Sequence, residues 1–154
     1  MKDLLNAAEM KAVDQRSIEE YGIPSLVLME RAALEVVKRA GELLEPGLSG
    51  NEALEYGPGR ERLLKERKRK TVWAVCGFGN NGADGAAAAR MLTLQGFSSV
   101  ILLPSQEGKR SRELEVQLSV AEKLGIPILT LGDPLPEACD LILDAVFGIG
   151  LSRP

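Results

Sequence analysis

Histidine is absent from the 154 residues, and cysteine occurs only twice. Without histidine, Ser-His and Cys-His nucleophilic mechanisms are excluded, together with histidine-ligated metals. Acid–base chemistry must then come from carboxylates, lysine, tyrosine or water. Cys76 lies inside an apolar run and Cys139 lies just before another, which favours two buried structural thiols over a disulfide or a nucleophile.

Strong net charge and long apolar runs are also missing. Nineteen Lys and Arg residues against 22 Asp and Glu residues give a net charge of −3, so there is no electrostatic basis for binding nucleic acid or an anionic membrane. No basic-then-apolar leader and no apolar stretch of membrane-spanning length is found, which predicts a soluble, cytoplasmic protein. Because 45% of the side chains are hydrophobic, this length can bury the core of one ordinary domain, and we predict a single domain over residues 1–154.

A glycine-rich turn is the most informative stretch that is present. The apolar run T-V-W-A-V-C at 71–76 predicts a strand buried on both faces, and the alanine-rich run 84–95 predicts a helix ended by Gly96. Between them, three glycines are expected to adopt conformations closed to other residues and to let a ligand approach, beside the free N–H groups of a helix start. They are Gly77, Gly79 and Gly82. The turn therefore suits an anionic or strongly polar ligand.

Two helices are predicted before this strand. Asn6 and Glu9 form the pattern of a capping box, and Ser25 is placed to cap a second helix that runs to about Leu44. The two helices are predicted to pack together through their apolar sides. These are Ala7, Met10, Val13 and Ile18 on the first helix and Leu28, Ala32, Val36, Ala40 and Leu43 on the second.

Residues 45–59 are predicted to form a loop. Seven Lys and Arg residues in 60–70 predict a solvated helix face, with an anion-binding patch as the alternative.

Further strands are predicted at 98–103, 126–131 and 140–147, with a helix at 111–124. This alternation predicts right-handed βαβ units in a mostly parallel sheet covered on both faces, a three-layer α-β-α Rossmann-like fold. The strand order 3-2-1-4 would place Asp144 and the residues 148–151 across one crevice from 80–84, at the carboxyl ends of the strands. The domain then consists of a helical part (1–45), a loop and basic segment (46–70) and the Rossmann-like part (71–154).

The spacing from Gly77 to Gly82 also fits the G-x-G-x-x-G fingerprint of nicotinamide dehydrogenases. That fingerprint needs an acid near the end of the second strand to hold the adenosine ribose, and the sequence offers none before Glu107. An NAD(P)-dependent oxidoreductase is therefore retained only as an alternative.

Three motifs in order resemble the N-terminal YjeF domain family, whose enzymes are NAD(P)H-hydrate epimerases. They are A-A-E-M-K-A-V-D-Q-R-S-I with G-I-P-S-L-V-L-M-E-R-A, then C-G-F-G-N-N-G-A-D-G, then D-A-V-F-G-I-G-L. The resemblance implies an isomerase that interconverts the R and S epimers of hydrated NADH and NADPH in nicotinamide nucleotide repair. It implies a potassium ion held by Asn81 and Asp144. Amide and carboxylate oxygens suit such a hard cation. The substrate-binding residues that it implies are Asn80, Asn81, Gly82, Ala83, Asp84, Gly148, Ile149, Gly150, Leu151, Ser152, Arg153 and Pro154.

Inversion by loss and re-addition of water needs an acid and a base. Asp144 and Asp84 are the candidate catalytic carboxylates; either is also a candidate ligand, and Asp84 has the alternative role of a carboxylate favoured by the helix dipole. Ala83 stands where the family usually has a glycine. An alanine is tolerated at this position if its φ is negative.

The family's sheet continues beyond the point where this sequence ends, so we expect an incomplete domain and keep a non-catalytic nucleotide-binding or scaffold module as an alternative. Expected partners are the small-molecule substrate, a second copy in a homodimer and a dehydratase acting on the same substrate. The fourth strand, 140–147, would be an apolar edge that favours association.

Overall fold

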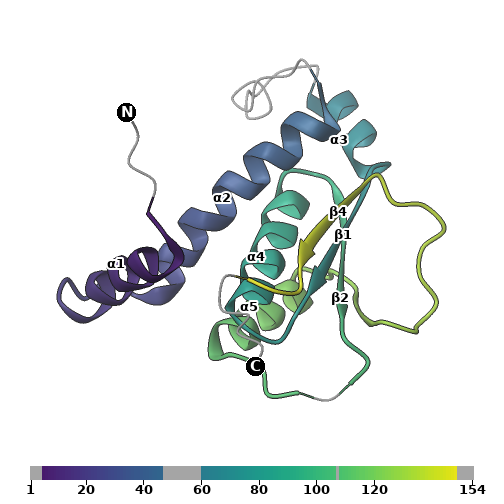
Figure 1. The fold of residues 1–154 in the computed structure, drawn as a ribbon. Coiled ribbons are helices and arrows are strands. Elements are labelled where there is room, and N and C mark those ends of the chain that lie inside the picture. Colours follow the sequence, from purple (N-terminus) through teal and green to yellow (C-terminus); the bar gives the residue numbers. More distant parts are fainter. Residues whose placement is uncertain (1–4, 47–59, 107, 149–154) are drawn as a thin grey trace.

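The computed structural model describes residues 5–46, 60–106 and 108–148, and its core is a four-stranded parallel sheet (Figure 1). The strand order β3-β2-β1-β4 confirms the predicted order. Each expected element is found: the strands at 71–76 and 98–103 have the predicted ends, and several of the other elements have shifted ends. The elements are α1 (Ala7–Glu19), α2 (Ser25–Leu44), α3 (Arg60–Lys68), β1 (Thr71–Cys76), α4 (Asn80–Leu94), β2 (Ser98–Leu103), α5 (Arg112–Lys123), β3 (Ile128–Thr130) and β4 (Leu141–Ala145).

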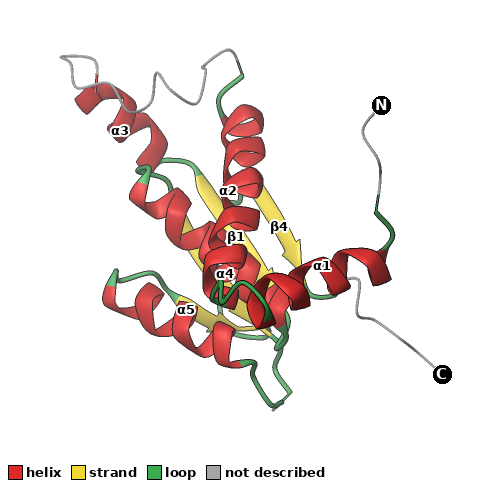
Figure 2. Cartoon of the chain, turned by 90° about the vertical axis from the view of Figure 1, so that its left-hand side faces the viewer, coloured by secondary structure: helices red, strands yellow, loops and turns green. Residues whose placement is uncertain are grey.

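Helices α2, α4 and α5 pack on one face of the sheet (Figure 2). Val72, Ala74 and Cys76 of β1 point into this layer and are fully buried. Trp73 and Val75 alternate with them and point to the opposite face. Within residues 5–46, 60–106 and 108–148 that second face carries no helix, so the sheet and one helical layer of the predicted three are described.

Small residues let α4 lie close to the sheet. Five alanines of this helix are fully buried, and a Cβ built on Gly85 would lie 2.4 Å from Ala145 Cβ and 3.1 Å from Cys76 Sγ. The helix begins at Asn80, four residues earlier than predicted, so the asparagine pair belongs to its first turn. Gly96 follows the helix with φ of +100°, which confirms it as the residue that ends the helix.

Helix α2 contributes a different stripe from the one predicted. Its buried residues are Met29, Ala33, Val37, Ala40 and Leu44. Of the predicted set only Ala40 is buried, because apolar residues on α2 form two adjacent stripes and a shift of one position rotates the buried face by about 100°. Ser25 does not cap the helix either: Pro24 is the N-cap residue, and the Ser25 hydroxyl donates to Glu113 Oε1 at 2.7 Å.

Helix α1 has the predicted start but not the predicted packing. Asn6 Oδ1 accepts from the backbone of Glu9 at 3.0 Å, and the Glu9 carboxylate accepts from Asn6 N at 2.8 Å, which confirms the capping box. The helix buries none of its residues. Met10 is 43% exposed and Val13 is 47% exposed, so the expectation of two packed helices is wrong for α1, which projects from the sheet in Figure 1.

Helix α3 confirms the solvated reading of the basic segment, with one exception. Arg67 is buried and forms an ion pair with the buried Glu45 at 2.6 Å, while its guanidinium lies 5.0 Å from the centre of the Phe97 ring. Arg67 also donates to the carbonyl of Gln95 at 3.0 Å, and Lys70 donates to the carbonyl of Leu44. These contacts attach the end of α2 to the segment that enters β1.

Strand β4 pairs only with β1 among the described residues, so it is an edge of the described sheet. Ile142 is 57% exposed on this edge, and a shallow apolar groove lies between Leu141 and Leu143 of β4 and Val36 and Leu43 of α2. The expected association through this edge stays a prediction. None of the described helices is both long enough and apolar enough to cross a membrane.

Candidate functional site

An open crevice of about 1400 Å³ lies at the carboxyl ends of the strands. This is where parallel α/β sheets bind ligands. Its walls come from α1, the glycine turn after β1, the loop after β2 and the segment after β4. The lining residues are Ala7, Ala8, Lys11, Asp14, Val75, Cys76, Gly77, Phe78, Gly79, Asn80, Asn81, Asp84, Pro104, Gln106, Leu131, Val146, Phe147 and Gly148.

The three glycines of the turn have two different roles. None of them has a positive φ, so the prediction of unusual backbone conformations is wrong, and space is the reason for glycine. A Cβ on Gly77 would lie 2.2 Å from the carbonyl oxygen of Val146, and one on Gly82 would lie 1.8 Å from that of Gly77. A Cβ on Gly79 meets nothing within 4 Å. Gly77 and Gly82 therefore permit close packing of the backbone, whereas Gly79 borders the open crevice.

The first turn of α4 supplies the polar side of the crevice. Gly79 is its N-cap residue and provides no side-chain cap, so the first N–H groups of the helix are free to meet an anion or a polar ligand. Asn80, Asn81 and Asp84 all line the crevice. Gly148 abuts Asn81, since a Cβ built there would lie 3.2 Å from Asn81 Cβ and 3.4 Å from its Oδ1. The predicted juxtaposition of the turn with Gly148 is therefore present.

Asp84 is the carboxylate with the most altered acidity. Burial, reinforced by the negative charge of Asp14, raises the pKa of Asp84 to about 6. An acid with this pKa exchanges its proton close to neutral pH, as a general acid or base must. The Asp14 charge comes from α1, which places that helix within electrostatic reach of α4.

Asp144 lies at the end of β4, opposite Val75 in the sheet. Its side chain is exposed, and its Oδ1 accepts a hydrogen bond from the backbone of Val146 at 3.1 Å. Asp144 does not line the crevice, although Val146 and Gly148 do. The carboxylate thus shapes the segment that enters the site, and its expected catalytic and cation-binding roles stay predictions.

Two other predicted residues are buried beneath the site. Gly82 and Ala83 face the protein interior and do not line the crevice. Ala83 is fully buried and its φ is not positive, so alanine is accommodated at this position of the turn. Ile149, Gly150, Leu151, Ser152, Arg153 and Pro154 lie outside the described residues.

Cys76 lines the crevice and is buried there. Burial raises the pKa of the Cys76 thiol to about 12, so the thiolate is scarce at neutral pH. Both cysteines are free thiols; Cys76 is buried as predicted, whereas Cys139 is only partly buried.

Sequence reasoning missed two walls of the crevice. Lys11 and Asp14 of α1 face it, and so do Pro104 and Gln106 after β2. The loop after β2 is positioned by Phe78, whose carbonyl accepts from Ser111 N at 2.8 Å. The available signal on α1 was its helical spacing, because positions 7, 8, 11 and 14, two alanines and two charged residues, share one face of the helix.

The comparisons with known proteins agree with this arrangement. The family model described as YjeF-related protein N-terminus matches residues 25–154. The chain belongs to this family. This match confirms the resemblance that the sequence motifs indicated. The glycine turn and the segment after β4 both lie inside the matched region.

Curated relatives of the family have the name NAD(P)H-hydrate epimerase. One from Weissella koreensis is 38% identical over 155 residues, which cover 100% of this chain and 59% of the relative. One from Limosilactobacillus fermentum is 37% identical, covering 97% of this chain and 61% of the relative. One from Oenococcus oeni is 42% identical, covering 91% of this chain and 56% of the relative. The chain therefore spans about three fifths of the length of the curated relatives it matches.

A solved structure shares the fold. The crystal structure of yeast ynu0 superposes with a TM-score of 0.71 at 23% sequence identity, covering 99% of this chain and 60% of the yeast chain. This likeness supports the fold, a parallel sheet flanked by helices.

Proposed function

We propose that this chain carries the site of an NAD(P)H-hydrate epimerase, an isomerase that interconverts the R and S epimers of hydrated NADH and NADPH. The observation that carries the proposal is the crevice formed by Asn80, Asn81, Asp84 and Gly148 in a chain whose relatives have that name. The free N–H groups at the start of α4 suit the phosphates of such a ligand, and the asparagines suit its amide and hydroxyl groups.

The chemistry asks for an acid and a base beside the hydroxyl-bearing carbon of the hydrated ring. Protonation of the hydroxyl lets it leave as water when its C–O bond breaks, and water added to the opposite face loses a proton as the new C–O bond forms. We assign one of these proton transfers to Asp84, because it lines the crevice and its pKa of about 6 keeps both forms populated near neutrality. We assign the second transfer to Asp144.

A potassium ion is the cofactor that we propose. The Asn81 amide oxygen borders Gly148, and the Asp144 carboxylate stands at the end of the adjoining strand β4. Amide and carboxylate oxygens are the ligands that hard cations prefer, which makes this donor set chemically suitable. A bound cation would fix the segment 144–148 against the start of α4 and neutralise part of the negative charge there.

The remaining assignments belong to the same proposal. Residues 148–154 would contact the hydrated cofactor together with 80–84, a dehydratase would use the epimer that this site supplies, and the protein would act as a homodimer in the cytoplasm. Each of these assignments can be tested separately from the reaction. Ligand crosslinking tests the cofactor contacts, a coupled assay tests the dehydratase, sedimentation tests the homodimer and cell fractionation tests the location.

The reaction is tested by supplying one purified epimer of NADH hydrate and following the other by chromatography. We expect the chain to accelerate interconversion and Gly79→Val to abolish it, since the valine side chain would occupy the crevice while φ of −91° at Gly79 tolerates it. Gly41→Val is the matched control, because Gly41 on α2 also meets open space far from the turn. Equal losses of folding and of ligand binding in Gly79→Val would show that this glycine is structural only.

One observation favours a second candidate, a nucleotide-binding module without epimerase chemistry. Asp144, one of the two candidate catalytic carboxylates, does not line the crevice. Such a module would bind NADH hydrate and leave its epimers unchanged. An oxidoreductase would instead produce a hydride-transfer absorbance change with an alcohol or carbonyl substrate, so the two assays separate all three functions.

A further inference from the structure

We propose that α1 forms the outer wall of the crevice and that Lys11 binds a phosphate group of the dinucleotide ligand there. The inference rests on the proposed function, because it takes the ligand to be a hydrated nicotinamide dinucleotide. It adds to the site a residue from a helix that lies before the region matched by the family model, residues 25–154.

Helix α1 does not belong to the hydrophobic core. It has no buried residue, and its helical start is specified locally by the capping box of Asn6 and Glu9. The side that faces the crevice carries Ala7, Ala8, Lys11 and Asp14, two small residues and two charged ones. A helix that contributes little to folding but lines a cavity with a polar face is placed for ligand contact.

Lys11 brings a positive charge to the described part of the crevice. Among the described lining residues it is the single cationic side chain, beside the two carboxylates of Asp14 and Asp84. The pyrophosphate of a dinucleotide is anionic and needs a compensating charge. Among the described residues, the start of α4 is a second source of positive potential at this site, because it offers backbone N–H groups.

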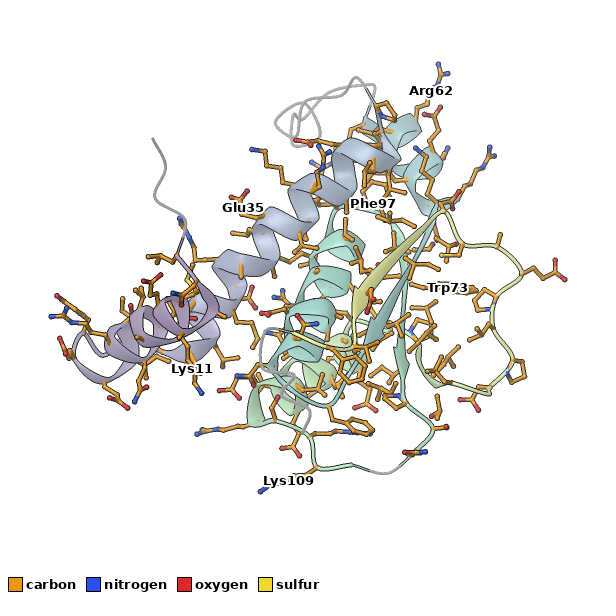
Figure 3. All side chains as sticks on the ribbon, in the orientation of Figure 1. Lys11, Glu35, Arg62, Trp73, Phe97 and Lys109 are labelled. Atoms are coloured by element: carbon orange, nitrogen blue, oxygen red, sulfur yellow. The ribbon has the colours of Figure 1, made fainter. Side chains whose placement is uncertain are left out.

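The Lys11 ammonium group is also available for a ligand. It makes no hydrogen bond or ion pair with the part of the chain that the structure describes, although Asp14 lies one turn further along the same helix. Its flexible four-carbon stem allows a compact charge to follow a phosphate in an open crevice. Figure 3 shows Lys11 at the end of the molecule where the loop carrying Lys109 lies.

Asp14 of α1 and Asp84 of α4 line the same crevice. The charge of Asp14 contributes to the raised pKa of Asp84, so the two carboxylates interact across the crevice. A ligand between them is enclosed by α1 on one side and by the glycine turn on the other. Lys11 lies one turn before Asp14 on the same wall of the crevice, and so within reach of that ligand.

The test measures the dissociation constant of NADH hydrate by calorimetry for the unmodified chain and for Lys11→Gln, Lys11→Arg, Arg16→Gln and Gly79→Val. Arg16→Gln is the matched control, because it removes one positive charge from the opposite side of α1, where Arg16 pairs with Glu20. We expect Lys11→Gln to weaken binding about tenfold and Lys11→Arg to retain most of the affinity. Arg16→Gln should stay within about twofold, since a distant exposed charge is screened by salt.

Repeating the titrations at low and at moderate salt separates a phosphate contact from a packing effect. The affinity of the unmodified chain should fall with salt, and Lys11→Gln should show a weaker salt dependence. If the unmodified chain binds and Gly79→Val does not, but Lys11→Gln behaves like Arg16→Gln, the inference about α1 is overturned while the proposed function stands. If the unmodified chain does not bind NADH hydrate, the proposed function fails, and the inference fails with it.

Discussion

Helices α1 and α2 are neighbours in sequence and both carry apolar stripes, yet they serve different parts of the molecule. Met29 of α2 is 7% exposed, whereas Met10 of α1 is 43% exposed. Helix α2 packs on α4 and the sheet, and two alanines in its buried stripe, Ala33 and Ala40, allow a close approach to the alanine-rich α4. Helix α1 instead lines the crevice. An amphipathic pattern thus identifies a helix but not the surface that it contacts.

The largest difference in stability is expected from the ion pair between Arg67 and Glu45, which attaches the end of α2. Arg67→Met should lower the free energy of unfolding by about 3–5 kcal/mol, because Glu45 would keep a buried charge without its partner. Arg62→Met is the matched control: the pair that Arg62 makes with Glu66 is exposed, and its loss should cost under about 0.5 kcal/mol. Urea denaturation followed by circular dichroism measures both. Similar costs would mean that the end of α2 is not held by Arg67.

A methionine on each helix gives a direct comparison of the two. Met29→Ala should lower the free energy of unfolding by about 2–3 kcal/mol, since it removes a buried side chain from the cluster that joins α2 to the sheet. Met10→Ala should change it by less than about 0.5 kcal/mol, because Met10 is exposed. The midpoints of urea unfolding test the pair, and a large loss in Met10→Ala would show that α1 takes part in the core.

The smallest effect concerns the electrostatic link between α1 and α4. The pKa of Asp84 is raised to about 6 in the folded protein, so between about pH 4 and pH 6 the folded state binds more protons than the unfolded state, and stability falls as the pH rises. Asp84→Asn should remove this fall and gain about 1 kcal/mol at pH 7, a value reduced for solvent screening of a half-buried group.

The same link can be broken from the other helix. Asp14→Asn should lower the pKa of Asp84, because one of its two causes disappears, and Glu19→Gln on the same helix is the control that preserves Asp14. Carboxyl chemical shifts followed through a pH titration report the pKa of Asp84 directly. An unchanged value in Asp14→Asn would place α1 outside the electrostatic reach of α4.

The sheet was predictable because its signals are local and repeated. Apolar runs flanked by glycines located the strands, and right-handed crossovers left few possible orders; the structure has the predicted order β3-β2-β1-β4. The buried side of α2 was not predictable in the same way. Val36 and Val37 are adjacent and both apolar, so only the position of α4 decides that Val37 is buried.

The site was predictable where it lies within one strand-turn-helix unit. Asn80, Asn81 and Asp84 were found from the turn itself, and all three line the crevice. Lys11 was not found, because its place at the site depends on how the chain reverses between α1 and α2 and on an orientation that no local pattern specifies. The reason for the glycines at positions 77 and 82 was likewise hidden, since it is the distance to carbonyl oxygens brought there by folding.

Trp73 has a spectroscopic consequence, because it is the single tryptophan of the sequence and lies in a central strand. Its ring is on the face of the sheet opposite the helical layer, away from α2 and α4 in Figure 3. The indole nitrogen is buried without a hydrogen-bond partner in the described part of the protein. Intrinsic fluorescence excited at the red edge of the absorption band therefore reports on this one face, and a partner or segment that covers it would shift the emission to shorter wavelength.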